Sequence, residues 1–302
     1  MIELHRLARI LPKISIEEIQ VLETIEEVVH RFEYVPLTTL EKRLDLSVDE
    51  ALFILTKLNK EKLVKRQTNP YLGYRISKAG YDVLALHALA AEDVILSLGQ
   101  PYGVGKEATV YRALDVQENE VAVKFLRWGG TSFRSVRRLR RVDNDNVSTW
   151  AEFSKQAANR EFQALRFMHR NKGKVPQPIA INRHVLVMSK MTGVLLRFVN
   201  ELTNPQAVLT QILEQTHLAY HKAKIIHGDL SEYNIFVDEE DHITIFDWPQ
   251  WQPVTHPNAM WLLKRDVTNI LKYFKRKFRI QSDSDEVLAR ITGKTERNHE
   301  HD

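Results

Sequence analysis

Apolar positions in the first ninety residues follow helical spacing, interrupted once by two short strand patterns. Ser47 and Glu50 stand three residues apart, which is the spacing of a capping box, and they mark the start of a third helix. The Asn69-Pro70 pair predicts a turn between the strands. The expected elements are helices over 15–34, 39–44 and 48–58, strands over 63–66 and 74–76, and a helix over 77–90. Three helices followed by a β-hairpin predict a winged-helix domain over residues 1–90.

Beyond residue 90 the pattern changes to strands mixed with longer helices. A glycine-containing turn precedes a strand, and a helix capped by Ser148 is expected to follow. The expected elements are strands at 121–125 and 184–188, helices at 148–169, 206–224 and 260–278, and a strand pair at 235–237 and 243–246. This order predicts an α+β fold, and the polar tail at 293–302 is expected to fray.

The strand pair at 235–246 brings three polar side chains to its open end. Asp229 follows a glycine in a turn, Asn234 ends the same loop, and Asp247 ends the second strand. A carboxylate that orients a nucleophile, with an amide and a carboxylate that hold a hard cation, is the minimal set for phosphoryl transfer. The spacing Asp-x-x-x-x-Asn matches the catalytic loop of protein kinases, although Gly228 stands where most of them have arginine.

A glycine loop ahead of the strand at 121–125 is a second candidate feature. Its small residues let backbone N–H groups approach phosphates. Lys124 closely resembles the Val-Ala-x-Lys lysine that holds the α- and β-phosphates in kinases. The sequence around Gly105 lacks the first glycine and the final Ser or Thr of a P-loop, which excludes a P-loop NTPase. The expected nucleotide contacts in the loop are Gly103, Val104, Gly105, Lys106 and Glu107.

Further residues are expected to complete a nucleotide pocket. Glu161, on the helix after the lysine strand, is predicted to hold Lys124, and Glu152 is the alternative. Residues 189–193 are predicted to form a hinge between an N-lobe at 91–188 and a C-lobe at 194–292. The remaining expected contacts with the nucleotide are Met188, Ser189, Met191 and Phe236.

Two basic clusters predict contact with nucleic acid. The first lies on the third helix and the hairpin of the winged helix, and the second is an arginine loop within a stretch from 121 to 142 that has no acidic residue. Arginines this close together repel one another unless an anion is present. The predicted contacts are Lys57, Lys60, Lys65, Arg66, Arg134, Arg137 and Arg138. Ser132 and Ser135 in the arginine loop are candidate self-phosphorylation sites.

Composition narrows the class of protein. The 302 residues are 43% hydrophobic and 27% charged with a formal net charge of +4, which fits a globular chain of one or two domains. The chain has no cysteine, so disulfides and thiolate metal sites are excluded. The sequence has no signal-peptide pattern and no run of about 18 apolar residues, so we expect a cytoplasmic protein that does not contact membranes.

Four motifs together closely resemble those of the RIO atypical serine/threonine protein kinases: Gly-x-Gly-Lys-Glu-Ala, Val-Ala-Val-Lys, His-Gly-Asp-Leu-Ser-x-Tyr-Asn and Ile-Phe-Asp-Trp-Pro-Gln. The winged helix resembles that of the second RIO subgroup. The resemblance implies a compact two-lobed kinase domain over 91–292, without an activation loop or peptide-binding helices, that binds ATP and Mg²⁺, with Mn²⁺ as an alternative. It implies that Asp229 is the catalytic aspartate, that Lys124 holds phosphate, and that Asn234 and Asp247 are metal ligands.

The resemblance also implies partners. RIO kinases take part in maturation of the small ribosomal subunit and associate with its precursor, so that particle and its rRNA are the expected partners. Members of the family are thought to work largely as ATPases. This makes Asp247 a candidate acceptor of the phosphoryl group.

Two other interpretations stay open. Aminoglycoside and choline kinases share the His-Gly-Asp and Asp-Trp motifs, but they need a large helical C-terminal region, and fewer than about sixty residues follow Asp247. A non-catalytic nucleic-acid-binding regulator would carry the same winged helix beside an idle kinase-like domain. ATP hydrolysis that disappears in Asp229→Ala would separate a working enzyme from such a regulator.

Overall fold

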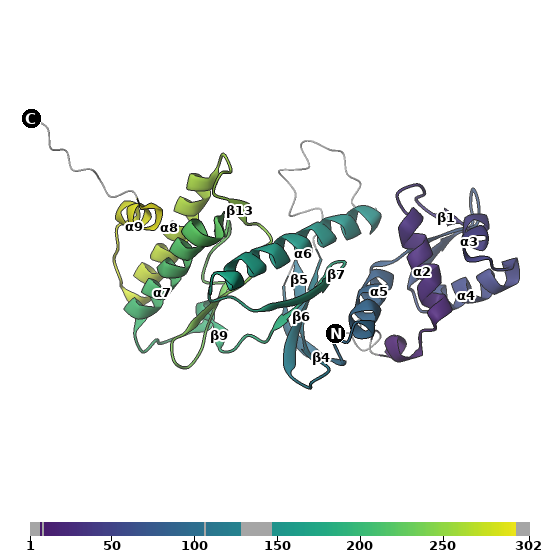
Figure 1. The fold of residues 1–302 in the computed structure, drawn as a ribbon, viewed down its shortest axis with the longest axis horizontal. Helices are drawn as coiled ribbons and strands as arrows, with labels where there is room; N and C mark the ends of the chain where they lie inside the picture. Colours follow the sequence, from purple (N-terminus) through teal and green to yellow (C-terminus); the bar gives the residue numbers. More distant parts are fainter. Residues whose placement is uncertain (1–6, 8, 106, 128–146, 294–302) are drawn as a thin grey trace, which may run out of the picture. The chain divides into compact units, whose positions relative to one another are not determined.

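The computed structural model describes residues 7, 9–105, 107–127 and 147–293, which form two compact units (Figure 1). Unit 1 comprises Met1–Ala158 and Ala180–Val187, and unit 2 comprises Asn159–Ile179 and Met188–Asp302. The predictions for the following residues lie outside the described part of the chain: Lys106, Ser132, Arg134, Ser135, Arg137 and Arg138. The predicted domain and lobe boundaries at 90, 188 and 193 stay predictions.

Unit 1 begins with the predicted winged helix. Its elements are η1 (Leu11–Lys13), α2 (Ile16–Val28), β1 (Val35–Pro36), α3 (Leu37–Leu44), α4 (Val48–Lys60), β2 (Val64–Gln67), β3 (Gly73–Ile76) and α5 (Lys78–Ala91). The three strands form an antiparallel sheet in the order β1-β3-β2. Capping boxes open α2 at Ser15 and α4 at Ser47, where the side chain of Glu50 accepts the Ser47 N–H at 2.9 Å. The fold predicted from the apolar pattern is therefore confirmed.

Helix α2 is shorter than its apolar pattern predicted. It ends at Val28, and the chain then turns, with Arg31 donating its N–H to the Val28 carbonyl at 2.9 Å. Phe32 still packs against the core, but from the turn after the helix. The helical spacing of apolar residues therefore extends past the end of the helix, because the turn directs the Phe32 side chain into the same core.

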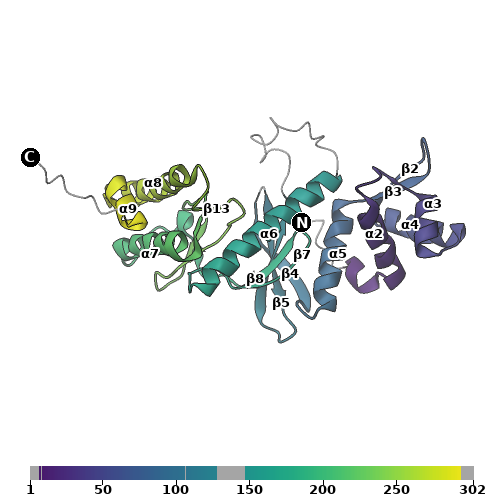
Figure 2. The ribbon, with the colours of Figure 1, turned by 45° about the horizontal axis from the view of Figure 1, so that its top comes forward.

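The second part of unit 1 is a sheet built against α5 (Figures 1 and 2). Its strands are β4 (Ser97–Val104), β5 (Ala108–Leu114), β6 (Glu120–Leu126), β7 (Pro178–Asn182) and β8 (Val185–Ser189), in the order β4-β5-β6-β8-β7. One hydrophobic core runs from the winged helix through α5 to the sheet, and it includes Leu22, Leu86 and Phe125. The winged helix and the sheet are therefore held by shared apolar burial.

A buried polar network reinforces this junction within unit 1. Asp82 of α5 is fully buried, and its carboxylate is 2.8 Å from His184 Nε2 and 2.9 Å from an Arg127 guanidinium nitrogen. Burial alone would raise the pKa of Asp82, but the hydrogen bond from His184 and the charge of Arg127 hold this pKa below its ordinary value. Nearby, Arg183 pairs with Glu26 of α2 at 2.6 Å.

Helix α6 (Val147–Arg170) passes from unit 1 into unit 2. The expected N-cap was wrong, because Val147 is already helical and Ser148 lies within the first turn. The inner face of the helix carries Ala157, Leu165 and Met168, which are buried.

Unit 2 gathers helices around short antiparallel strands. Its elements are β9 (Val194–Leu195), η2 (Leu196–Phe198), α7 (Pro205–Leu218), the π-helical turn η3 (Ala219–Ala223), β10 (Ile225–Ile226), β11 (Ile235–Val237), β12 (Ile243–Ile245), β13 (Gln252–Pro253), α8 (Ala259–Phe278) and α9 (Ser284–Thr292). Strands β12, β11 and β9 form one sheet, and β10 pairs with β13. Helices α7, α8 and α9 lie together in Figures 1 and 2. None of the helices described is long and apolar enough to cross a membrane.

Helix α9 was not predicted. The Asp283 side chain caps it by accepting the N–H groups of Asp285 and Glu286, both at 2.9 Å. His217 and His221 both have a ring nitrogen within hydrogen-bonding distance of the Ile291 carbonyl, at 3.1 and 2.7 Å. These two histidines therefore hold the end of α9.

Candidate active site

The predicted catalytic loop connects β10 to β11 in unit 2. Asp229 is exposed, while Leu230 behind it and Asn234 at the end of the loop are buried. Gly228 has φ +79°, in the left-handed region, and a Cβ there would lie 2.7 Å from the Gln250 carbonyl oxygen. An arginine at this position would therefore be both strained and obstructed. The departure from the usual kinase triplet has a local steric reason.

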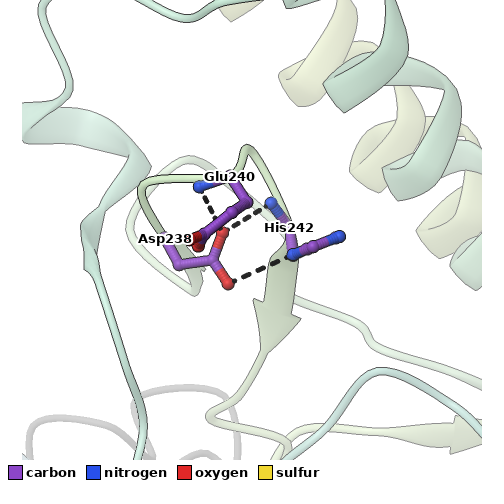
Figure 3. A group of neighbouring side chains, drawn as sticks. All are labelled: Asp238, Glu240 and His242. Atoms are coloured by element: carbon purple, nitrogen blue, oxygen red, sulfur yellow. Dashed lines mark hydrogen bonds and ion pairs between the residues drawn. The ribbon is translucent and has the colours of Figure 1, made fainter.

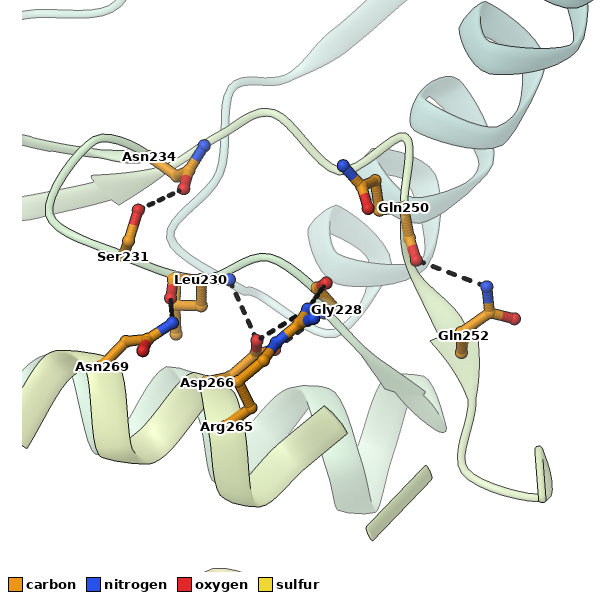
Figure 4. Close-up of polar contacts among 9 residues, drawn as sticks. All are labelled: Gly228, Leu230, Ser231, Asn234, Gln250, Gln252, Arg265, Asp266 and Asn269. Atoms are coloured by element: carbon orange, nitrogen blue, oxygen red, sulfur yellow. Dashed lines mark hydrogen bonds and ion pairs between the residues drawn. The ribbon is translucent and has the colours of Figure 1, made fainter. Parts of the chain in front are cut away.

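A buried carboxylate braces this loop from behind (Figure 4). Asp266 of α8, which is 1% exposed, accepts the Gly228 N–H at 2.7 Å and the Leu230 N–H at 3.2 Å. The neighbouring Arg265 donates to the Gly228 carbonyl. These bonds fix the backbone on both sides of Asp229, so its side chain is presented from a rigid turn.

Sequence reasoning missed the role of Asp266. A signal was present, because Asp266 shares the apolar face of its helix with Leu263, Val267 and Ile270, all of them buried. A carboxylate on the buried face of an amphipathic helix needs hydrogen-bond donors. Burial raises the pKa of Asp266 to about 7, against the opposing effect of the two N–H bonds.

The two predicted metal ligands lie side by side in unit 2. The Asn234 amide nitrogen is 3.4 Å from an Asp247 carboxylate oxygen, and the Ser231 hydroxyl donates to the Asn234 amide oxygen at 2.9 Å (Figure 4). Asp247 has φ +65°, a conformation that aspartate tolerates better than most residues and that is often found at functional sites. Amide and carboxylate oxygens are ligand types that Mg²⁺ takes, so these two neighbouring side chains fit that ion.

The segment after Asp247 is fastened to its surroundings within unit 2. His227 has its Nε2 3.1 Å from the Phe246 carbonyl, and its ring lies 4.4 Å from that of Trp248. Arg160 of α6 donates to the carbonyls of Pro249 and Trp251, and the Trp251 indole donates back to the Arg160 carbonyl at 2.7 Å. These contacts hold Asp247 beside the catalytic loop.

The phosphate-binding side of the predicted site lies in unit 1. The glycine loop is a tight connection between β4 and β5, closed by a hydrogen bond of 2.9 Å from the Gly105 N–H to the Ala108 carbonyl. A Cβ on Gly103 would meet no other atom within 4 Å, so packing does not require glycine there. Lys124 is 2% exposed, on β6, in register with Val110 of β5. The open space at Gly103 therefore lets another group approach the backbone of this loop.

The structure favours Glu161 over Glu152 as the acidic partner on α6. Glu161 is fully buried, whereas Glu152 is exposed and accepts a hydrogen bond from Gln156 at 2.9 Å. A fully buried glutamate is rare unless it is paired. The assignment of Glu161 to Lys124 stays a prediction, because the two residues belong to different units.

The predicted hinge residues belong to unit 2. Met188 and Met191 are buried at 1% and 3% exposure, and Ser189 is the last residue of β8. The Ser189 N–H donates to the Gln177 carbonyl at 2.9 Å, so of its two backbone groups the carbonyl is the one suited to adenine. Phe236 on β11 is buried and lies 5.0 Å from the Phe246 ring.

A second acidic cluster lies on the β11–β12 turn (Figure 3). Single ligand atoms of Asp238, Glu240 and His242 lie within 4.8 Å of one another. The Asp238 carboxylate accepts the backbone N–H groups of Glu240 and His242 at 3.1 and 2.8 Å, which is the pattern of an Asx turn. The turn structure accounts for the cluster, and we assign it no metal.

The basic residues predicted on the winged helix are exposed but not equivalent. Lys57 pairs with Glu18 of α2 at 3.0 Å. Lys60 at the end of α4 and Lys65 and Arg66 on β2 are exposed, and no ion pair is described for them within residues 9–105. These three cations lie at the C-terminal end of α4 and on β2.

Comparison with known proteins identifies two family models in the chain. The RIO domain matches residues 109–287, and the Rio2 N-terminal domain matches residues 11–92. The RIO-type serine/threonine-protein kinase Rio2 of Methanocaldococcus jannaschii is 36% identical, over 84% of this chain and 94% of that protein. The serine/threonine-protein kinase rio2 of Schizosaccharomyces pombe is 32% identical, over 89% of this chain and 79% of that protein.

Among solved structures, the Rio2 kinase of Chaetomium thermophilum in an ADP/Mg²⁺-phosphoaspartate complex is similar in fold. The TM-score is 0.81 with 30% sequence identity, covering 96% of this chain and 90% of that chain. The similarity includes both the winged helix and the kinase-like part.

Proposed function

The chain belongs to the RIO-type serine/threonine-protein kinases, on their Rio2 branch, and from this premise we propose that it works as an ATP- and Mg²⁺-dependent ATPase in small ribosomal subunit maturation. The observation that carries the proposal is the Asn234–Asp247 pair beside a catalytic loop braced by Asp266. ATP is the substrate of the phosphoryl transfer, and its γ-phosphoryl group is the group transferred.

The residues have distinct roles in this proposal. Lys124 holds the α- and β-phosphates, and Asn234 and Asp247 hold Mg²⁺, which neutralises charge on the phosphates when it is bound. Asp229, exposed on its braced turn, orients the attacking water and accepts its proton. The buried brace means that the loop need not reorganise during the reaction.

Asp247 is our proposed phosphoryl acceptor. A carboxylate oxygen of Asp247 attacks the γ-phosphorus, the bond between that phosphorus and the β–γ bridging oxygen breaks, and ADP leaves. Water, oriented by Asp229, then hydrolyses the acyl phosphate to give inorganic phosphate and the free carboxylate. Two observations support this: the complex of the Chaetomium relative contains a phosphoaspartate, and only the short segment 248–258 separates Asp247 from α8. That segment is too short for the activation loop with which kinases hold a peptide.

The proposed partner is a precursor of the small ribosomal subunit, contacted through its rRNA. Support comes from the winged helix, whose exposed charge at Lys60, Lys65 and Arg66 suits phosphate groups. Because phosphate contacts release counterions, this association is expected to weaken steeply with salt.

The test is ATP hydrolysis by the purified chain, measured with and without small-subunit precursor particles, beside Asp229→Ala. Hydrolysis that depends on Asp229 and changes with the particle supports the proposal. Hydrolysis that does not change with the particle but is stimulated by a peptide or a small molecule would indicate an ordinary kinase. In the same samples, the absence of acid-labile phosphate on Asp247 during turnover contradicts the acyl-phosphate step alone.

A further inference from the structure

The exposed face of α4 is unusual for a helix that reads a duplex. Four exposed residues, at intervals of four, three and four, lie on one face of this helix: Asp49, Phe53, Thr56 and Lys60. Phe53 is 74% exposed, although the opposite face of α4 is buried in the core. In a winged helix, α4 is the element presented to nucleic acid. An exposed aromatic ring at its centre therefore points to a contact.

Charge is divided along α4 from acidic to basic. Asp49 and Glu50 lie in the first turn, and Lys57 and Lys60 lie in the last. Helix-turn-helix proteins place the N-terminal residues of this helix against base edges in the major groove. Two carboxylates at that end would meet the phosphates of a duplex with like charge, so end-on insertion of α4 is disfavoured.

The basic end of α4 continues onto the hairpin. Strand β2 presents Lys65 and Arg66 to solvent, and α4 packs against β2. Lys60 lies about 10 Å along the helix axis from Phe53, since it is seven positions further along the helix. An aromatic ring followed by a row of cations is the arrangement with which proteins bind single strands, because a base stacks on the ring while phosphates meet the cations.

We propose that the winged helix binds single-stranded RNA, with Phe53 stacking on an unpaired base and Lys60, Lys65 and Arg66 contacting backbone phosphates. A base in a duplex has both faces covered by its neighbours, so only an unpaired base can use the ring. The inference rests on the proposed ribosomal function, because that function is the reason for expecting RNA and not DNA. It adds that the RNA is single-stranded and that it binds at α4 and β2.

The test is fluorescence anisotropy of the full chain with a labelled single-stranded RNA of about 12 nucleotides, and with the blunt duplex of the same sequence. Wild type should bind the single strand more tightly than the duplex. Phe53→Ala should weaken single-strand binding about 5- to 100-fold without changing the salt dependence. Phe53→Trp should keep the affinity, whereas Phe53→Leu should reduce it as Phe53→Ala does, because a leucine is apolar but cannot stack.

Charge is tested separately from stacking. The double variant Lys60→Ala/Lys65→Ala should reduce the slope of log K against log salt by about 0.7 for each phosphate that the protein no longer neutralises. Phe198→Ala, which removes another exposed phenylalanine (64% exposed), and Lys222→Ala, which removes an exposed lysine of unit 2, are the matched controls and should bind RNA as wild type does.

Three other outcomes overturn the inference, and a fourth overturns the proposed function. Duplex binding as tight as single-strand binding, with no effect of Phe53→Ala, would place α4 in a groove. Phe53→Ala that weakens co-sedimentation with precursor particles but not binding of free RNA would make Phe53 a protein contact. If wild type hydrolyses ATP in response to particles yet binds no single strand, this inference fails while the proposed function stands. If particles neither bind nor change hydrolysis, the proposed function fails instead.

Discussion

Replacing Asp266 by asparagine tests whether the buried brace controls the catalytic loop. The carboxylate offers one oxygen to the Gly228 N–H and the other to the Leu230 N–H. An asparagine of the same shape has only one acceptor oxygen, so one of these buried N–H groups is left without an acceptor. An unsatisfied buried donor costs about 1–3 kcal/mol. If most of that cost appears in the transition state, kcat falls about 5- to 100-fold.

The same substitution should remove a pH dependence. The pKa of Asp266 is about 7 in the folded protein, because of burial, against an ordinary value of 3.8. The stability contributed by the protonated form is fully present below about pH 4 and is lost as the pH rises to 7. The difference between these two pKa values corresponds to a decrease of about 4 kcal/mol in the free energy of unfolding. Only the ionised Asp266 carboxylate has both oxygens free of a proton, so only this form accepts both N–H groups and fully braces the loop. We therefore expect kcat to rise as the pH increases through about 7.

The assays are ATP hydrolysis and urea unfolding between pH 5 and about 8.5, the range around this pKa. Wild type should show an acid limb in kcat near pH 7, and Asp266→Asn should not. Asn269→Ala is the matched control, because Asn269 lies on the same helix and makes only a long bond of 3.4 Å to the Leu230 carbonyl. An Asp266→Asn protein with the kcat and the pH profile of wild type would refute the bracing argument.

Three further substitutions test other contacts. Asp82→Ala should destabilise unit 1 by about 3–5 kcal/mol in urea unfolding. Because the pKa of Asp82 in the folded protein lies below its ordinary value of 3.8, the stability advantage of wild type over this variant should be lost as the pH falls below about 4. Gly228→Ala should cost about 1–3 kcal/mol in thermal unfolding and slow hydrolysis, since it places a Cβ in a left-handed residue; unchanged kinetics would mean that the loop adapts. Arg160→Ala should lower the melting temperature and kcat together by freeing two carbonyls beyond Asp247, and a full kcat would show that the segment is held by its other contacts.

The features predicted correctly from sequence depend on neighbours in the chain. The capping box at Ser47 is set within four residues, and the turn between β11 and β12 within five. The juxtaposition of Asn234 and Asp247 also follows from local structure, because the two residues end adjacent strands of one hairpin. Periodicity and turn chemistry are sufficient for such features.

The features that were missed depend on contacts between distant segments. Asp266 reaches Gly228 across 38 positions of sequence, and Arg160 reaches Trp251 across 91. Helix α9 is only nine residues long, and its apolar residues form a buried face only when α7 and α8 pack against them. A pattern read along the chain does not predict such partners, although a charged residue on the apolar face of a helix indicates that it needs a hydrogen-bonding partner.

The continuous core of unit 1 limits how freely its parts can be exchanged. Asp82 belongs to the winged helix by sequence, yet its partners His184 and Arg127 belong to the sheet. A graft that replaced this winged helix by another of the same shape would bury His184 and Arg127 without their carboxylate, and it would leave Phe125 and Trp150 facing unmatched side chains. The winged helix and the sheet that carries Lys124 are thus constrained to evolve as a pair, and any chimera must carry over the inner face of α5.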